Sequence, residues 1–233
     1  MIRNFLFSVI FFSGIIIISI VFTPSFFFPQ KVALIGGKLM GHWTGFCLKF
    51  FLNTKIEVKG RENINESKKF FIAASHQSMF ETFYLQTIFN SPIFILKKEL
   101  TLIPVFGWYL KKIGSISINR NKITKDDLGF FGNISEKLMN TKRPLIIFPQ
   151  GTRVLPDERP PFKRGVSRIY EELKIICQPV AINSGYVWPK SGYKNKQRTI
   201  TISILKPIHP GIPKDEFLEN LENSIYAELD LLG

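Results

Sequence analysis

One histidine and one glutamate have the residue types and the spacing of a catalytic pair. His76 follows the apolar run Phe70–Ala74, and Glu81 comes five residues later. A carboxylate beside one imidazole nitrogen fixes the ring's tautomer and stabilises the charge that forms when the other nitrogen accepts a proton. Such a pair can act as a general base toward a substrate hydroxyl. A histidine that is merely hydrogen-bonded in a loop is the alternative, and the pair alone does not exclude it.

The spacing of His76 and Glu81 predicts the secondary structure that can bring their side chains together. Residues five apart on a helix are rotated by about 140° and do not face each other. We therefore expect His76 in a loop and Glu81 in the first turns of the helix that follows, with Ser75 or Ser78 capping that helix. The sequence G-x-S-x-G does not occur in the chain, which argues against a serine hydrolase.

A second group of polar residues follows the apolar run 145–148. Gly151 lets backbone approach a ligand closely, and Thr152 supplies a hydroxyl. Arg153 can hold a phosphate group through two donors. Because an arginine at the end of a buried strand is costly unless it is paired, a structural salt bridge is the alternative role for Arg153.

Short apolar runs rich in β-branched residues alternate with helical patterns from Ile56 onward. This alternation predicts an α/β fold with a mixed, largely buried central sheet flanked by helices. Active sites on such sheets lie in loops at the strand ends, where His76 and Arg153 fall. We predict strands at 56–58, 70–74, 93–96, 115–118, 145–148, 178–182 and 199–205, and helices at 79–88, 104–113, 125–140, 166–173 and 214–231.

The N-terminal segment is strongly apolar. No charged residue lies between Arg3 and Lys31, and a helix needs about 20 apolar residues to cross a bilayer core. We predict an uncleaved membrane anchor. A cleaved signal peptide fits less well, because the apolar run is long and no small-x-small site follows it. Arg3 stands alone before the segment whereas basic residues are frequent after it, so the positive-inside rule places the rest of the chain in the cytoplasm.

The stretch 31–53 has a different pattern. It is mainly apolar or small, and its polar residues lie within about 20° of one line on a helix. A narrow basic stripe on a wide apolar helix predicts a helix in the membrane interface. A helix packed on the body, with its lysines in water, is the alternative. The stripe consists of Lys31, Lys38, His42 and Lys49.

The formal net charge of +13 favours an anionic partner, either a phospholipid surface or nucleic acid. The apolar N-terminus favours the membrane, and no nucleic-acid-binding motif is present. The two cysteines, Cys47 and Cys177, are too few for a disulfide framework or a zinc site, and both are expected to be buried thiols.

Several motifs occur in an order that resembles the 1-acylglycerol-3-phosphate acyltransferase family. That family carries H-x-x-x-x-D, G-x-x-x-I-x-R and F-P-E-G-T-R, followed by an apolar strand that ends near a proline. The corresponding segments here are 76–81, 114–120, 148–153 and 179–189, and the segments 97–100, 104–107 and 162–165 also look like the family. The resemblance covers roughly residues 70–189. It implies an acyltransferase domain over residues 55–233, preceded by a membrane anchor and interfacial helix over residues 1–54.

The resemblance implies transfer of a fatty acyl group from acyl-CoA or acyl-carrier protein to the free hydroxyl of 1-acylglycerol-3-phosphate, which gives phosphatidate. His76 would be the general base and Glu81 would orient it. The implied partners are a phospholipid membrane, lysophosphatidate and the thioester donor, with no metal, no other cofactor and no nucleic acid. The acceptor's phosphate would be bound by Arg153, Thr152, Gly151, Arg120, Lys97 and Lys98.

Two positions depart from the family pattern. Glu81 stands where aspartate is usual, which lengthens the side chain but keeps its charge. Gln150 stands where glutamate is usual, which removes a charge but keeps a hydrogen-bonding group. The alternatives are another acceptor, such as glycerol-3-phosphate, a lyso-ornithine lipid or another lysophospholipid, and a non-catalytic membrane-binding protein.

Overall fold

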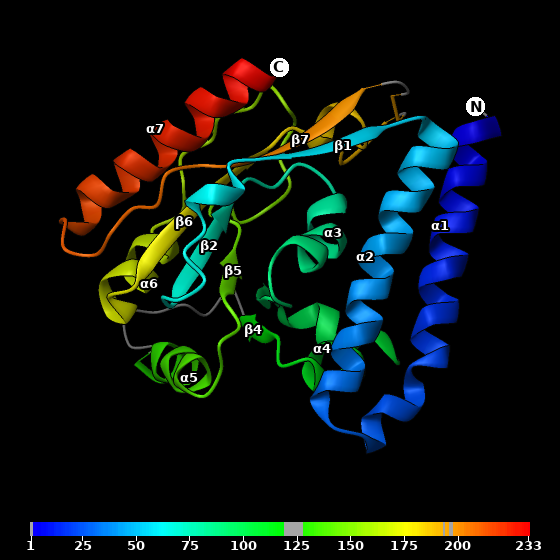
Figure 1. The fold of residues 1–233 in the computed structure, drawn as a ribbon, viewed down its shortest axis with the longest axis horizontal. Coiled ribbons are helices and arrows are strands. Elements are labelled where there is room, and N and C mark those ends of the chain that lie inside the picture. The colour runs from blue at the N-terminus through cyan, green and yellow to red at the C-terminus, as the bar shows by residue number, and fades with distance from the viewer. Residues whose placement is uncertain (1, 119–127, 193, 196–197) are drawn as a thin grey trace. The chain divides into compact units, whose positions relative to one another are not determined.

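The computed structural model describes residues 2–118, 128–192, 194–195 and 198–233. Figure 1 shows strands and helices alternating along the chain from β1 onward. The strands form a seven-stranded mixed sheet in the order β1-β7-β6-β2-β5-β3-β4. The predicted α/β fold is therefore confirmed. The strands are β1 (Lys55–Lys59), β2 (Phe70–Ala74), β3 (Ile93–Lys97), β4 (Ile116–Ile118), β5 (Leu145–Ile147), β6 (Ile176–Ile182) and β7 (Thr199–Ile204).

The helices agree with the expected pattern to within a few residues at each end, except that residues 125–127 of one predicted helix lie outside the described residues. The α-helices are α1 (Ile2–Val21), α2 (Gln30–Leu52), α3 (Phe80–Ile88), α4 (Phe106–Lys112), α5 (Leu128–Met139), α6 (Gly165–Leu173) and α7 (Lys214–Leu232). Short 3-10 helices include η3 (Lys98–Leu102) and η5 (Ser184–Tyr186). The chain divides into two compact units, one of residues 1–47 and 82–145 and the other of residues 48–81 and 146–233.

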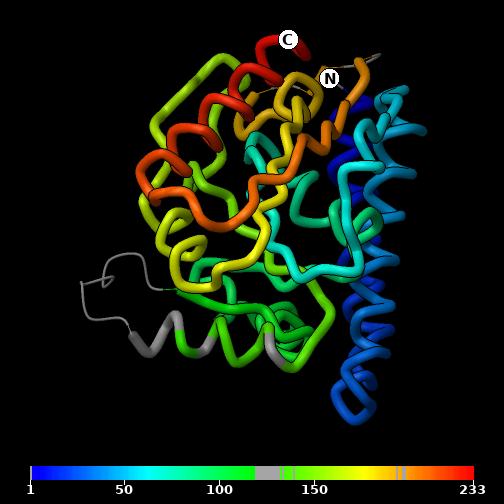
Figure 2. Tube along the Cα trace, turned by 60° about the vertical axis from the view of Figure 1, so that its left-hand side comes forward, coloured from blue at the N-terminus to red at the C-terminus, as the bar shows by residue number. Residues whose placement is uncertain are grey.

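The first unit contains the apolar N-terminal helix. Figures 1 and 2 show α1 running side by side with α2. Their close approach requires Gly14, because a Cβ there would lie 2.1 Å from Nε1 of Trp43. That indole nitrogen donates a hydrogen bond to the carbonyl of Phe11 at 3.2 Å. Small residues at a helix contact allow such approach, as in helix pairs within membranes.

The opposite face of α1 carries a row of exposed apolar side chains. They are Ile2, Phe5, Leu6, Val9, Phe12, Ile16, Ile17, Ile20 and Val21. By length and composition the segment Ile2–Phe27 is able to cross a membrane. On α2 the predicted basic stripe is present, since Lys31, Lys38, His42 and Lys49 are all exposed. Cys47 is a buried free thiol, as expected.

A guanidinium group joins three loops of the first unit. Arg143 donates to the carbonyls of Ser91 at 2.5 Å, Ile113 at 2.8 Å and Pro92 at 3.3 Å. We expect Arg143→Met to lower the free energy of unfolding by about 2 kcal/mol, because it leaves three carbonyls without a charged donor. Thermal unfolding in detergent measures this change. Lys142→Met, at the exposed neighbouring residue, is the control, and equal melting temperatures for the two variants would contradict the expectation.

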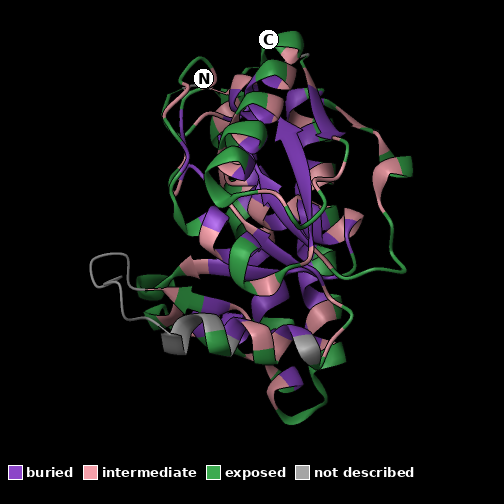
Figure 3. Ribbon diagram, turned by 90° about the vertical axis from the view of Figure 1, so that its left-hand side faces the viewer, coloured by how far each residue is buried: buried purple, intermediate pink, exposed green. Residues whose placement is uncertain are grey.

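In the second unit, strands β2, β6 and β7 are buried along most of their length, whereas no residue of β1 is buried (Figure 3). Strand β2 pairs in parallel with β6, which pairs in antiparallel with β7. Every residue of β6 is buried, including the free thiol of Cys177. Helix α7 packs onto this unit through Phe217, whose ring stacks on that of Tyr170 at a centroid distance of 3.8 Å. The loops that follow β2, β5 and β6 carry the polar residues of the candidate site.

Candidate active site

His76 lies in the loop that joins β2 to α3, as the spacing predicts. Ser75 fixes the start of this loop, because its hydroxyl accepts the N–H of Ile182 at 2.8 Å and donates to the same residue's carbonyl at 3.2 Å. Ser78 accepts the N–H of Phe80, the first residue of α3, at 3.2 Å. Of the two serines considered as caps, Ser78 is therefore the one that satisfies a free donor at the helix start.

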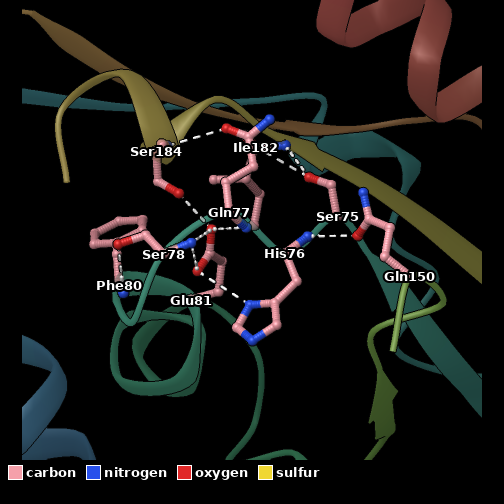
Figure 4. Close-up of polar contacts among 10 residues, drawn as sticks. Ser75, His76, Gln77, Ser78, Phe80, Glu81, Gln150, Ile182 and Ser184 are labelled. Atoms are coloured by element: carbon pink, nitrogen blue, oxygen red, sulfur yellow. Dashed lines mark hydrogen bonds and ion pairs between the residues drawn. The ribbon is translucent and has the colours of Figure 1, made fainter. Parts of the chain in front are cut away.

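The Glu81 carboxylate is fully buried at the start of α3 and faces His76 (Figure 4). Its Oε2 lies 3.4 Å from Nδ1 of His76. This is an ion-pair distance without hydrogen-bond alignment, and His76 Nδ1 has no other hydrogen-bond partner among the described residues. Contacts of this kind are often long in a site without substrate and shorten when substrate binds. The geometry fits a carboxylate that orients an imidazole.

Backbone donors hold the same carboxylate in place. Oε1 of Glu81 accepts the N–H groups of Gln77 and Ser78, each at 3.2 Å, and Oε2 accepts the N–H of Ser78 at 3.1 Å. The hydroxyl of Ser184 also donates to Oε1. These donors solvate a buried negative charge, which would otherwise be costly. Both oxygens of the Glu81 carboxylate are therefore hydrogen-bonded where it lies beside His76.

The loop 148–154 surrounds His76. The ring of Phe148 stacks on the imidazole with centroids 4.1 Å apart and planes 18° apart. Oε1 of Gln150 accepts the N–H of His76 at 2.8 Å, and the N–H of Val154 donates to the His76 carbonyl at 2.9 Å. The histidine side chain keeps 14% of its surface exposed, and Figure 4 shows Nε2 directed away from Glu81. His76 can thus present Nε2 to a substrate while its backbone and ring face are fixed.

Gly151 and Arg153 lie between Gln150 and Val154, the two residues of this loop that are hydrogen-bonded to His76. Gly151 has a φ of 74°, a conformation that favours glycine. Thr152 is exposed and Arg153 is half-buried. No described residue forms a salt bridge or hydrogen bond with the Arg153 side chain. Among these residues, nothing therefore supports the alternative that Arg153 serves in a structural salt bridge. A half-buried guanidinium without a counter-ion is suited to an anionic ligand.

Helix α7 anchors the chain that follows Arg153. The N–H of Phe162 donates to Glu222 at 2.6 Å, and the hydroxyl of Tyr226 donates to the carbonyl of Pro160 at 2.5 Å. Burial raises the pKa of Tyr226 to about 12, so its hydroxyl keeps the proton of this bond at neutral pH. Arg159 adds a partly exposed ion pair to Asp230 at 2.6 Å. The segment carrying Arg153 is therefore held at both ends.

The remaining residues expected at the site have different outcomes. Lys97 ends β3 and Lys98 begins η3; both side chains are exposed, and both belong to the first unit. Arg120 lies outside the described residues. Sequence reasoning missed the contacts of Phe148 and Ser184 with the pair. Ser184 could have been found, because it follows a buried apolar strand just as His76 does.

A model of the acyltransferase family matches residues 55–183, which is more than half of the chain. The chain belongs to the acyltransferase family. The match begins at the first residue of β1 and ends one residue after β6, so it contains both His76 and Arg153. The family match thus covers the part of the chain that carries His76, Glu81 and Arg153.

Individual members of the acyltransferase family cover most of the chain. A relative from Pseudomonas aeruginosa is 32% identical over 72% of this chain and 66% of its own length. One from Saccharomyces cerevisiae is 31% identical, covering 86% of this chain and 70% of its own, and one from Helicobacter pylori is 32% identical, covering 78% and 77%. All three are named 1-acyl-sn-glycerol-3-phosphate acyltransferase.

A solved structure supports the same fold. The crystal structure of the 1-acyl-sn-glycerophosphate acyltransferase PlsC from Thermotoga maritima superposes with a TM-score of 0.75. The comparison covers 99% of this chain and 96% of that chain, at 22% sequence identity. The similarity at this level of identity shows the fold, including the two N-terminal helices.

Gln150 stands where the family motif has glutamate. Its hydrogen bond with the backbone of His76 explains how glutamine can take the place of glutamate at this position. The side chain is buried, and it uses one oxygen to accept the N–H of His76. Glutamate carries an equivalent oxygen, whereas leucine carries none. We expect Gln150→Glu to keep acyl-transfer activity and Gln150→Leu to lower kcat about tenfold, which corresponds to one lost hydrogen bond. Steady-state thiol release measures both variants, and equal activity of the two would contradict this role.

Proposed function

We propose that this protein transfers a fatty acyl group from a thioester to the free hydroxyl of 1-acylglycerol-3-phosphate and so forms phosphatidate. The observation that carries the proposal is the wrapping of loop 148–154 around His76. It joins a candidate base to the loop of Arg153, whose guanidinium has no partner among the described residues, through the hydrogen bonds of His76 with Gln150 and Val154. The names of the three relatives and the family membership support the same reaction.

In the proposed reaction Nε2 of His76 accepts the proton of the acceptor's hydroxyl. The hydroxyl oxygen then attacks the thioester carbonyl carbon, a C–O bond forms and the C–S bond breaks. The thiolate leaves and takes the proton from His76, so no acyl-enzyme forms. Glu81, 3.4 Å from Nδ1, stabilises the imidazolium while it carries the proton.

The acceptor's phosphate supplies the anionic partner that Arg153 lacks among the described residues. An arginine can bind phosphate through two parallel hydrogen bonds, which also orient the glycerol. Thr152 and the backbone at Gly151 lie in the same loop and would complete the phosphate site. Lys97, Lys98 and Arg120 stay proposed as phosphate-binding residues on the family resemblance alone.

The donor would be acyl-CoA or acyl-carrier protein, and the mechanism uses no metal and no other cofactor. A protein base and a thioester leaving group are sufficient for every proton and bond in the transfer. Chelator treatment tests this part of the proposal. The rate of thiol release is expected to stay unchanged after dialysis against EDTA, and a loss restored by a divalent cation would contradict it.

We also propose that the protein is bound to a membrane with its catalytic residues on the cytoplasmic face. The exposed apolar side chains of α1, the basic stripe of α2 and the length of the segment Ile2–Phe27 support membrane association. The basic residues that follow α1 support the orientation. Protease treatment of sealed inverted and right-side-out vesicles tests it, with cleavage of the 55–233 region expected only in inverted vesicles.

An acceptor panel tests the proposed function. Purified protein is incubated with acyl-CoA or acyl-carrier protein thioesters and, in turn, lysophosphatidate, glycerol-3-phosphate, a lyso-ornithine lipid and lysophosphatidylcholine. Product mass is expected to show phosphatidate from lysophosphatidate at the highest kcat/KM. A higher value for another acceptor would replace the proposed substrate, and no product with any acceptor would indicate a non-catalytic membrane-binding protein.

A further inference from the structure

We propose that Ser184 is a positioning residue, whose hydroxyl holds the Glu81 carboxylate against His76. This inference rests on the proposed function, in which His76 is the general base and Glu81 orients it. Figure 4 shows Ser184 directed at the carboxylate from the side opposite the imidazole. The two residues are far apart in sequence, and Ser184 comes from η5, immediately beyond the end of β6.

The hydrogen bond from Ser184 differs from the other hydrogen bonds to Glu81, because its donor lies in a different part of the chain. The N–H donors of Gln77 and Ser78 precede Glu81 by four and three residues, so they belong to the same loop. Among the described residues, Ser184 is the one donor to this carboxylate from outside the segment 77–81. Ser184 is itself completely buried, so water has no access to replace its hydroxyl. It therefore ties the loop that carries the pair to the end of a buried strand.

The segment around Ser184 is fixed on both sides. Asn183 accepts the N–H of Thr201 at 2.8 Å and donates to the carbonyl of Leu232 at 3.1 Å. The N–H of Gly185 donates to Oε1 of Gln77 at 3.0 Å. A Cβ at Gly185 would lie 2.9 Å from Cβ of Gln77, so the two segments pack too closely for a larger residue. The Ser184 hydroxyl is thus held in place and does not follow movements of the carboxylate.

A fixed donor matters more for glutamate than for aspartate. The extra methylene of Glu81 adds a rotatable bond, so the backbone donors of its own loop leave the carboxylate more ways to orient. The Ser184 hydroxyl engages Oε1, which leaves Oε2 on the side of His76 Nδ1. Without that hydroxyl only the N–H groups of Gln77 and Ser78 hold the carboxylate, and Oε2 can turn away from the imidazole. Loss of Ser184 should therefore act on catalysis through Glu81.

The first test is the Ser184→Ala variant in the thiol-release assay. We expect kcat to fall about tenfold or more, the effect of losing one hydrogen bond to a charged group, while KM for lysophosphatidate changes less than about twofold. Ser203→Ala is the matched control, because Ser203 is also buried and also donates to a glutamate, Oε1 of Glu228, at 2.5 Å. Its kcat is expected to stay at the wild-type value. A rise in KM with unchanged kcat in Ser184→Ala would overturn the inference.

A double-mutant cycle separates positioning from a general structural role. In a Glu81→Ala background Ser184 has no carboxylate to hold, so adding Ser184→Ala should change kcat less than about twofold. An equal loss in both backgrounds would overturn the inference. If Ser184→Ala lowers thermal stability, Ser184→Cys carries the same test, since its thiol leaves no cavity but is a weaker donor. A wild-type kcat in Ser184→Cys would then contradict the proposed role of the Ser184 hydroxyl.

Failure of the proposed substrate can be told apart from failure of the proposed role of Ser184. Wild-type protein is first assayed on the acceptor panel, and the acceptor with the highest kcat/KM is used for the cycle. Phosphatidate formation with an additive cycle would remove the role of Ser184 and leave the proposed function in place. A different preferred acceptor with a coupled cycle would remove the proposed substrate and leave the role of Ser184 in place.

Discussion

His76→Ala is expected to lower kcat for acyl transfer by about 10³-fold, the range that a positioned general base contributes. The imidazole is the group that can accept the hydroxyl proton, and its removal leaves the carboxylate of Glu81 without a partner to orient. Release of free thiol from acyl-CoA in the presence of lysophosphatidate measures the effect. The variant should remain folded, because the backbone bonds of His76 to Gln150 and Val154 do not involve the imidazole.

The chain offers two matched controls for this substitution. It contains three histidines, and the other two, His42 and His209, have exposed side chains. His42→Ala and His209→Ala should each keep wild-type kcat. Thiol release by His76→Ala at a rate within about tenfold of wild type would contradict general-base catalysis by this residue. Loss of activity in all three variants would point to a loss of fold or of membrane binding.

Arg153→Ala is expected to raise KM for lysophosphatidate by about 10- to 100-fold, as for the loss of a charge-assisted contact. The reason is that Arg153 is half-buried and has no anionic partner among the described residues, and in the proposed complex the acceptor's phosphate provides one. The change in kcat should be smaller, because the group that binds phosphate is separate from the reacting hydroxyl. Initial rates over a range of acceptor concentrations give both constants.

A second arginine controls for the change in net charge. Arg164, also in the second unit, has an exposed side chain and can be replaced with the same loss of charge. Arg164→Ala should leave KM within about twofold of wild type. Monoacylglycerol, which has the hydroxyl but no phosphate, extends the comparison, and its slow acylation should be insensitive to Arg153→Ala. Equal effects of Arg153→Ala on both acceptors would place the phosphate elsewhere.

The geometry of the catalytic pair could be predicted from the sequence because it is local. Five residues on a helix place His76 and Glu81 on different faces, so the pair required a loop followed by a helix start. The structure has this arrangement, with His76 in the loop after β2 and Glu81 as the second residue of α3. The apolar runs likewise predicted the strands, since burial on both faces leaves few polar positions along them.

The surroundings of the pair could not be predicted, because they depend on the order of strands in the sheet. Strand β2 lies between β6 and β5, which come about 100 and 70 residues later in the chain. This order brings Ser184, after β6, and Gln150, after β5, to the same loop. Hydrophobic patterning assigns strands to a sheet but does not set which strands are neighbours. The role of Gln150 as an acceptor for His76 therefore emerged only from the structure.

Simultaneous measurement of free thiol and phosphatidate is the most direct test of acyl transfer to the acceptor with His76 as the base. Purified protein is mixed with acyl-CoA and lysophosphatidate, and thiol is followed by colour while phosphatidate is quantified by mass in the same samples. Wild-type protein is expected to form the two products in equal amounts, and His76→Ala is expected to form neither above background. Thiol release without phosphatidate, or phosphatidate formation by His76→Ala at the wild-type rate, would contradict direct acyl transfer to the acceptor with His76 as the base.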